Sequence, residues 1–243
     1  DTQTCRISGM PDVPPEENTI YRAFTLFRKK TGISSGAAFE VKKHIPKQAG
    51  LGGGSSNGAY ALMMLDRLFE SGLPRKELEG MAAELGSDVP FFFRGPCALV
   101  SGRGDVVRSI SPRPDLYCLL TMPDFPINTG SAYEAFDKQG PVYQPVDADE
   151  LVRRYREEEP GNWGFYNSFE PVIEANFPPL RSFIDALAEQ GAEYAGMSGS
   201  GSVCYGIFRK KENAEQALHA FSGRLGNCCL VYLLDKSPDT VLQ

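Results

Sequence analysis

The segment Gly50-Leu51-Gly52-Gly53-Gly54-Ser55-Ser56 constrains the fold most, because it separates a strand-like run from an apolar pattern with helical spacing. Residues 37–43 before it have strand character. The residues after it that share one helical stripe, and that we expect in the core, are Ala61, Leu62, Leu65, Leu68 and Phe69. The chain therefore places strand, glycine loop and helix in direct succession.

Such a loop is suited to hold a phosphate group. Glycine lets backbone amides approach an anion without obstruction, and the first amides of a helix carry partial positive charge toward the same point. Ser55 and Ser56 would add hydroxyl donors or a ligand for magnesium. The spacing matches neither G-x-x-x-x-G-K-[ST] nor the dinucleotide pattern G-x-G-x-x-G with its acidic partner. The alternative is a flexible turn before an ordinary helix.

Composition restricts the class of protein. A chain of 243 residues with 42% hydrophobic residues is long enough for one large or two modest domains. No apolar run approaches the roughly 18–20 residues that span a bilayer, and the first residues have no secretory-signal character, so we expect a soluble, cytoplasmic protein without membrane contact. The net charge of −6 argues against broad nucleic-acid binding. An anionic ligand would therefore need a local site.

The cysteines give no metal motif. Their spacing contains no C-x-x-C pair, and most of them stand in apolar, strand-like runs. We expect buried thiols, because a free cysteine packs as a small hydrophobic residue. The residues concerned are Cys5, Cys97, Cys118, Cys204, Cys228 and Cys229.

The remaining pattern predicts helices and strands in both halves of the chain. A helix through Ile20, Ala23, Phe24 and Phe27 should end at Gly32. The other expected helices contain residues 78–85, 129–136, 172–177, 180–190 and 212–222, and a polar, solvated helix and loop should occupy 138–161. The expected strands are a hairpin of 97–101 with 106–108, and residues 116–122, 202–208 and 228–234.

Two further segments could belong to a site. Asp88 lies in Gly86-Ser87-Asp88-Val89-Pro90, followed by three phenylalanines, where it could act as a catalytic base or serve only as a turn residue. The segment from Gly196 to Gly201 places glycine amides before a strand, and alone it could be a tight connection.

Taken together and in this order, the glycine loop after Ile45-Pro46, the Asp88 segment and the turn at residues 197–201 resemble the GHMP kinase superfamily. The triple glycine, where most members have Gly-Leu-Gly-Ser-Ser, is similar to its 4-diphosphocytidyl-2-C-methyl-D-erythritol kinases. The resemblance extends from about Asn18 to Leu234. It implies an α+β protein of two domains with the active site in the cleft between them. Residues 1–113 would form a ribosomal protein S5 domain 2-like domain, and residues 114–243 a ferredoxin-like domain.

The resemblance also implies an activity, ATP-dependent phosphorylation of the 2-hydroxyl of 4-diphosphocytidyl-2-C-methyl-D-erythritol, with Mg²⁺, in a monomer or homodimer. Asp88 would be the catalytic base and touch the substrate, together with Thr129 on the substrate side. Gly199 and Gly201 would support the site, and Ser55 or Ser56 would meet the metal. The residues that would bind ATP are Pro46, Lys47, Gln48, Ala49, Gly50, Leu51, Gly52, Gly53, Gly54, Ser55 and Ser56, with Asn18 and Lys43 near the nucleotide.

The chain departs from the family pattern in one respect. The family opens with a strand Pro-Ala-Lys-x-Asn-Leu-x-Leu and a following Asp-Gly-Tyr-His, and these 243 residues contain neither. We expect that the natural beginning precedes this sequence. Two alternatives to the implied function are another small-molecule kinase of the superfamily, acting on homoserine, mevalonate or a sugar, and a noncatalytic nucleotide-binding relative.

Overall fold

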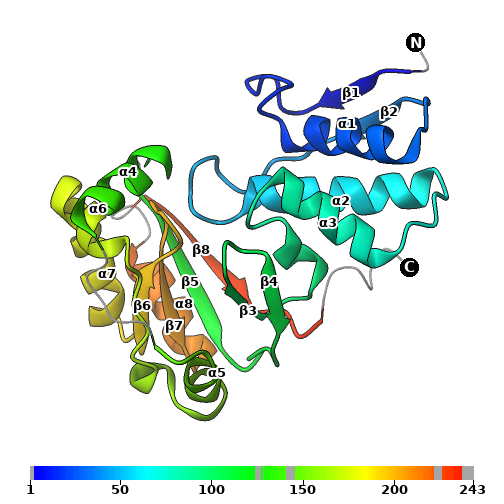
Figure 1. Cartoon of the computed structure of the whole chain (residues 1–243). Coiled ribbons are helices and arrows are strands. Elements are labelled where there is room, and N and C mark those ends of the chain that lie inside the picture. The colour runs from blue at the N-terminus through cyan, green and yellow to red at the C-terminus, as the bar shows by residue number, and fades with distance from the viewer. Residues whose placement is uncertain (1–2, 124–126, 128, 141–145, 222–225, 237–243) are drawn as a thin grey trace. The chain divides into compact units, whose positions relative to one another are not determined.

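The computed structural model describes residues 3–123, 127, 129–140, 146–221 and 226–236 (Figure 1). The chain divides into two compact units. The first is built mainly from Asp1–Lys47 and Gly52–Ser109, and the second from Gln48–Leu51 and Ile110–Lys236. The four residues Gln48–Leu51 of the glycine loop thus belong to the second unit, although the rest of the loop belongs to the first.

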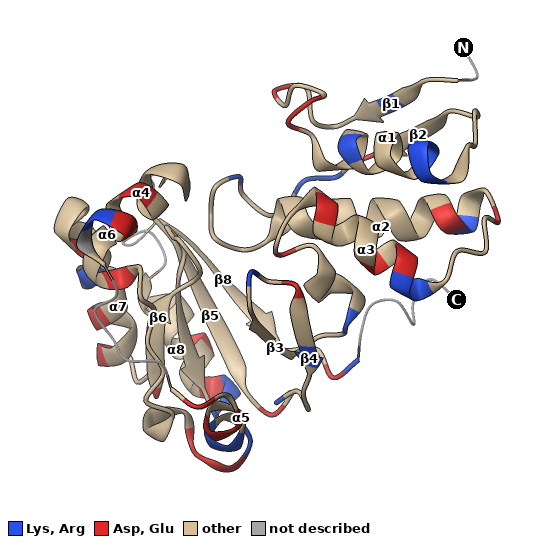
Figure 2. Ribbon diagram, viewed as in Figure 1, with Lys and Arg blue, Asp and Glu red and all other residues tan. Residues whose placement is uncertain are grey.

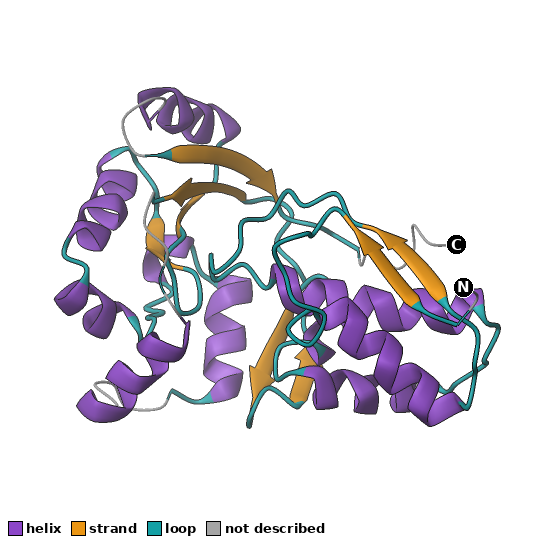
Figure 3. Ribbon diagram, turned by 90° about the horizontal axis from the view of Figure 1, so that it is seen from above, coloured by secondary structure: helices purple, strands orange, loops and turns teal. Residues whose placement is uncertain are grey.

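The first unit combines helices with two separate strand pairs (Figure 3). Its helices are α1 (Thr19–Thr31), α2 (Gly53–Leu68), α3 (Arg75–Leu85) and the short 3-10 helix η1 (Pro90–Phe93). Strands β1 (Cys5–Ser8) and β2 (Ala37–Glu40) pair in parallel, and β3 (Ala98–Ser101) and β4 (Val106–Ser109) form an antiparallel hairpin. The expected strand at residues 37–43 therefore ends earlier, at Glu40.

Helix α1 follows from its local sequence. The side chain of Asn18 caps the helix by accepting a hydrogen bond from the amide of Ile20 at 3.0 Å. At the other end, Gly32 takes the left-handed conformation, with φ +74°, and its amide donates to the carbonyl of Arg28. The residues that were expected to face the core are all buried, and they are Ile20, Ala23, Phe24 and Phe27.

The core of the first unit lies between α1, α2 and α3, with Phe93 of η1 packed against it. Of the α2 residues expected in the core, Leu62 and Leu65 are fully buried, whereas Leu68 is 63% exposed. The prediction for Leu68 was wrong because Leu68 is the last residue of the helix, where the stripe runs past the end of the core. Phe69 after it turns back and stacks on Phe27 with a centroid distance of 6.2 Å.

The second unit is a four-stranded antiparallel sheet with the strand order β6-β7-β5-β8. Its strands are β5 (Tyr117–Met122), β6 (Tyr194–Met197), β7 (Cys204–Phe208) and β8 (Asn227–Tyr232). Its helices are α4 (Thr129–Gln139), α5 (Ala148–Glu157), α6 (Glu170–Asn176), α7 (Pro179–Glu189) and α8 (Lys211–Phe221), with the 3-10 helix η2 (Pro160–Asn162). The sequence pattern predicted three of these strands and missed β6.

The two faces of this sheet bury different partners, because successive side chains of a strand point to opposite faces. Leu119 and Phe208 point to the face that α6, α7 and α8 cover. Cys118 and Ile207 point to the other face and pack with Trp163, which follows η2. Figure 1 shows α6, α7 and α8 beside the sheet, with α5 near one end of its strands.

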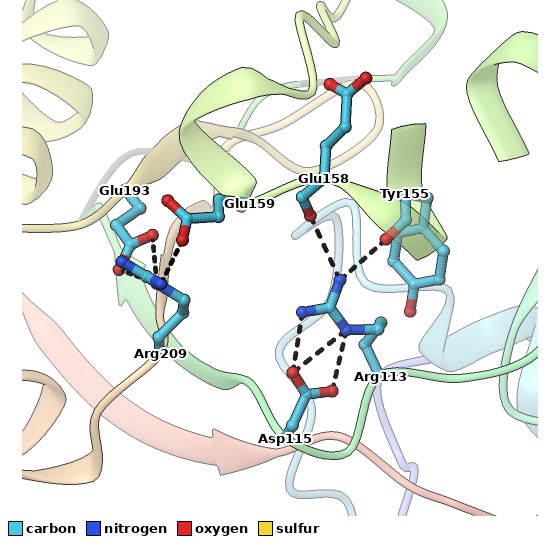
Figure 4. A network of polar contacts seen from close by, with 7 residues as sticks. All are labelled: Arg113, Asp115, Tyr155, Glu158, Glu159, Glu193 and Arg209. Atoms are coloured by element: carbon cyan, nitrogen blue, oxygen red, sulfur yellow. Dashed lines mark hydrogen bonds and ion pairs between the residues drawn. The ribbon is translucent and has the colours of Figure 1, made fainter. Parts of the chain in front are cut away.

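Two arginines, Arg113 and Arg209, hold the segment that follows α5 (Figure 4). Arg113 bonds the carboxylate of Asp115 and the carbonyl oxygens of Tyr155 and Glu158, and Arg209 bonds the carboxylates of Glu193 and Glu159. Exposed ion pairs contribute little stability by themselves, but bonds to carbonyl oxygens fix the path of the backbone. The segment leading from α5 toward α6 is thereby anchored to the sheet.

Helices and strands together confirm the α+β class. Among the described residues, no helix has both the length and the apolar character needed to cross a membrane. None of the six cysteines forms a disulfide, and Cys118 and Cys204 are buried as expected. Cys5, Cys97 and Cys228 are half-buried and Cys229 on the edge strand β8 is exposed, so the expectation of buried thiols holds for two of the six.

Candidate active site

The start of α2 presents amides that no side chain caps. The N-cap is Gly52, with φ +64°, and glycine has no side chain that could accept a hydrogen bond from the helix. The first backbone bond runs from the amide of Ser56 to the carbonyl of Gly52 at 2.9 Å. The amides of Gly53, Gly54 and Ser55 therefore precede the helical ladder, and the helix dipole adds partial positive charge at the same point.

Close neighbours explain why glycines stand here. A Cβ atom at Gly52 would lie 3.2 Å from the ring of Phe92, and the positive φ would be strained for any other residue. A Cβ atom at Gly53 would lie 3.0 Å from the Nζ of Lys43 and 3.0 Å from a methyl carbon of Ile45. The ammonium group of Lys43 is thus placed directly against the first turn of α2.

Lys43 and Lys47 add positive charge to this place. Burial, followed by repulsion from the charge of Lys47, holds the pKa of Lys43 below its usual value. Neither lysine forms an ion pair with a residue in the described part of the chain, whereas Lys42 approaches Glu40 at 3.9 Å. Figure 2 marks the basic residues on the segment between β2 and α2. Two uncompensated cations beside an open helix start favour a ligand with several negative charges.

The start of α1 lies against the same turn. Thr19, next to the buried cap Asn18, donates its hydroxyl to the carbonyl of Gly54 at 2.7 Å. A Cβ atom at Gly58 would lie 3.4 Å from the Cβ of Thr19, so the two helices approach closely where α2 has no side chain. The Oδ1 of Asn18 is used for capping. Its predicted place near a nucleotide is compatible with this position and stays a prediction.

Asp88 lies in the turn between α3 and η1. Its carboxylate is exposed and forms no hydrogen bond or ion pair with any described residue. The turn lies close to α2 at both of its ends: Gly58 faces Leu85 before it, and Gly52 faces Phe92 after it. The residues on either side of the Asp88 turn thus pack against α2, and the role of Asp88 at the glycine loop stays a prediction.

The backbone beside Asp88 is held from two sides. Arg22 of α1 donates from Nη2 to the carbonyl of Leu85 at 2.9 Å. From the other side, Gly104 in the β3–β4 turn has φ +97°, and a Cβ atom there would overlap the carbonyl oxygen of Ser87. Only glycine permits this approach, which brings the hairpin turn against the residue before Asp88. Sequence reasoning missed both contacts.

Comparison with known proteins decides the family. The model of the GHMP kinases N terminal domain matches residues 18–96, and that of the GHMP kinases C terminal domain matches residues 149–227. The chain is 35% identical over 216 residues to a protein of Thermodesulfovibrio yellowstonii named 4-diphosphocytidyl-2-C-methyl-D-erythritol kinase, covering 87% of this chain and 76% of that protein. The chain belongs to the GHMP kinase family. The resemblance inferred from the ordered motifs is thus confirmed.

Other similar proteins are consistent with membership of this family. A protein of the same name from Pelotomaculum thermopropionicum is 38% identical over 208 residues, or 84% of this chain and 72% of that protein. A crystal structure of 4-(cytidine 5'-diphospho)-2C-methyl-D-erythritol kinase is similar with a TM-score of 0.77 at 28% identity, covering 95% of this chain and 82% of that one. A homoserine kinase from Cytophaga hutchinsonii has the same TM-score of 0.77 at 18% identity, covering 96% and 82%, and shows the fold alone.

The second unit of this GHMP kinase contains the other predicted site residues. Gly199 and Gly201 have φ +56° and +86°, and the turn they form packs against Gly50 of the glycine loop. Thr129 is the first residue of α4, and its side chain lies outside the described residues. The hydrogen bond from Ser198 to the carbonyl of Gly50 is a contact that sequence reasoning missed.

A metal site built by the protein alone has no support in this GHMP kinase. Among the described residues, no group of three or more His, Cys, Asp or Glu side chains could hold a metal ion. The hydroxyl of Ser56 donates to the carbonyl of Gly53 at 3.0 Å, so its lone pairs remain for a cation. Ser55 and Ser56 at the start of α2 stay the predicted protein ligands of a metal.

Proposed function

We propose that this GHMP kinase transfers the terminal phosphoryl group of ATP to the 2-hydroxyl of 4-diphosphocytidyl-2-C-methyl-D-erythritol, a step of the non-mevalonate route to isoprenoid precursors. The observation that carries the proposal is the uncapped start of α2 with the Nζ of Lys43 against its first turn. That place is suited to a polyphosphate. The two relatives at 35% and 38% identity, both named for this activity, support the choice of acceptor.

The residues of the first unit would divide the work. Amides from Gly52 to Ser56 would bind the phosphates, and Lys43 and Lys47 would neutralise their charge. During transfer, the bond between the γ-phosphorus and the bridging oxygen of ADP breaks, and a bond forms to the acceptor oxygen. The hydroxyl proton passes to the exposed carboxylate of Asp88, which also orients that oxygen.

Magnesium fits this proposal as an ion carried by the nucleotide. Mg²⁺ is often bound by one or two protein groups together with substrate phosphates, rather than by a cage of protein side chains. Ser55 or Ser56 would supply the protein ligand, in agreement with the free lone pairs of Ser56. When bound, the ion would offset charge on the β- and γ-phosphate oxygens.

The fold does not distinguish between possible substrates. The identity of the phosphoryl acceptor therefore needs a direct test. The structures of the homoserine kinase and of the 4-(cytidine 5'-diphospho)-2C-methyl-D-erythritol kinase have the same TM-score of 0.77. With ATP and Mg²⁺, we expect ADP release in the presence of 4-diphosphocytidyl-2-C-methyl-D-erythritol and none with homoserine or mevalonate. Turnover with one of the latter would replace the proposed substrate. ATP binding without turnover of any of these acceptors would favour the noncatalytic alternative.

Replacing Lys43 by methionine tests the phosphate site. The methionine keeps the apolar stem but removes a charged donor at the start of α2, and a hydrogen bond to a charged group contributes about 1.5–3 kcal/mol. We expect the dissociation constant for ATP to rise roughly tenfold to hundredfold. Lys42→Met is the matched control, since Lys42 is next in sequence, highly exposed and near Glu40. Equal affinities in both variants, measured by calorimetry, would remove Lys43 from the site.

A further inference from the structure

The late glycine turn contacts the glycine loop within the second unit. The hydroxyl of Ser198 donates to the carbonyl of Gly50 at 2.9 Å, and the amide of Val203 donates to the carbonyl of Ala49 at 3.4 Å. A Cβ atom at Gly199 would lie 3.3 Å from the oxygen of Gly50. The two backbones therefore approach each other closely, and the Ser198 hydroxyl links them by a side-chain hydrogen bond.

Asn167, ahead of α6, grips this turn. Its Nδ2 donates to the carbonyl of Met197 at 2.8 Å and to the carbonyl of Gly199 at 2.7 Å, on both sides of Ser198. Its Oδ1 accepts from the amide of Phe169 at 2.9 Å, which fixes the side-chain amide to the start of α6. The side chain thus uses both of its polar atoms on backbone groups, which leaves it little freedom to rotate.

Glu170, the first residue of α6, holds the same turn by a different bond. Its Oε1 accepts from the amide of Met197 at 2.7 Å. Burial raises the pKa of Glu170, the repulsion of Glu174 adds to this, and the bond from Met197 and the charge of Arg181 oppose it. The charge of Glu170 adds to the effect of burial in raising the pKa of Tyr194 and of Cys204. Glu170 is half-buried, and its bond to the amide of Met197 holds the backbone on the side of the turn that precedes Ser198, so this geometry points to a positioning role.

These bonds bear on the direction of one amide in the loop. A trans peptide unit is planar, and its carbonyl and N–H point in opposite directions. Because Ser198 holds the Gly50 carbonyl toward the turn, the N–H of Leu51 in the same peptide unit must point away from the turn. An amide directed in this way is free to meet a ligand, whereas a loop without the bond could rotate the peptide.

We propose that Asn167, Glu170 and Ser198 are positioning residues that set the affinity for nucleotide by holding the Gly50–Leu51 peptide in its binding orientation. The proposal rests on the proposed function, because it assumes that the loop binds ATP. The three residues act through the loop and need not touch the nucleotide themselves. Their loss should therefore weaken nucleotide binding more than it slows phosphoryl transfer.

The experiment compares Asn167→Asp and Ser198→Ala with two controls. Asn167→Asp keeps the shape but removes both donated bonds, and Asn176→Asp makes the same change where one bond reaches the carbonyl of Val172 at 2.8 Å. Ser198→Thr restores a hydroxyl. A net hydrogen bond is worth roughly threefold to tenfold in affinity, so we expect KM for ATP to rise by about that factor in the first two variants. We expect kcat to change by less, and Asn176→Asp and Ser198→Thr to resemble the wild type.

Hydrogen exchange without nucleotide separates this proposal from the proposed function. Amides of residues 46–52 should exchange faster in Asn167→Asp and Ser198→Ala than in the wild type and Asn176→Asp. Faster exchange in a protein that does not bind ATP would confirm that these residues hold the loop, and would contradict the kinase function and with it the effect on nucleotide affinity. Unchanged exchange in both variants, or a loss of kcat with KM for ATP unchanged, would overturn the positioning role. Glu170→Gln, which keeps an acceptor for Met197, should leave loop exchange slow.

Discussion

Replacing Asp88 by asparagine should lower kcat roughly 10²–10⁴-fold while leaving the dissociation constant for ATP close to that of the wild type. The change removes the carboxylate that would take the proton from the substrate hydroxyl. General base catalysis contributes a factor of that size. The carboxylate is exposed and forms no bond with a described residue, so the substitution breaks no contact that holds the first unit together. Single-turnover kinetics and calorimetry would measure the two quantities separately.

The control for this variant is Asp12→Asn, because Asp12 is another exposed aspartate of the first unit. We expect it to change neither kcat nor ATP binding. If Asp88→Asn weakened ATP binding as much as turnover, Asp88 would act on the nucleotide rather than on the acceptor. If it left kcat unchanged, Asp88 would be the turn residue that the local sequence also permits, and the base would have to lie elsewhere.

Helices α1, α2 and α3 were predictable because each one repeats its buried residues with helical spacing and has a clear end. Gly32 and Gly86 follow α1 and α3 as the sequence predicted. Strand β6 was not recognised, since its four residues include Gly196 and sit just ahead of a glycine-rich turn. The residues of β6 are strand because they pair with β7, and a pairing between distant segments has no signature in the local sequence.

The candidate site was predictable in its parts but not in its connections. The glycine loop and Asp88 were found because glycine runs and a turn carboxylate are visible locally. Gly104 resembled any hairpin glycine, although it is needed for the approach to Ser87. The bond between Ser198 and Gly50 spans 148 positions and depends on the folding of the second unit. Such contacts follow from tertiary structure and leave no spacing rule in the chain.

Replacing Gly50 by alanine should weaken ATP binding by at least roughly a hundredfold, or about 3 kcal/mol. A Cβ atom there would overlap the carbonyl oxygen of Ser198 and lie 3.1 Å from that of Gly201, and φ is +72°. Both neighbours are backbone atoms, so no flexible side chain can move aside. The loop must therefore leave its place against the turn, and the Gly50–Leu51 peptide must reorient.

Gly32→Ala separates this effect from backbone strain alone. Gly32 has φ +74°, almost the same as Gly50, but a Cβ atom there would meet nothing within 4 Å. The left-handed conformation costs a side-chain residue about 1–2 kcal/mol, so Gly32→Ala should lower Tm by several degrees and leave ATP affinity unchanged. Gly50→Ala should lose affinity beyond any loss of Tm, because the overlap displaces the loop itself. Should Gly50→Ala retain wild-type affinity, the glycine loop would not bind the nucleotide through this conformation, and the phosphate site at the start of α2 would have to work without Gly50.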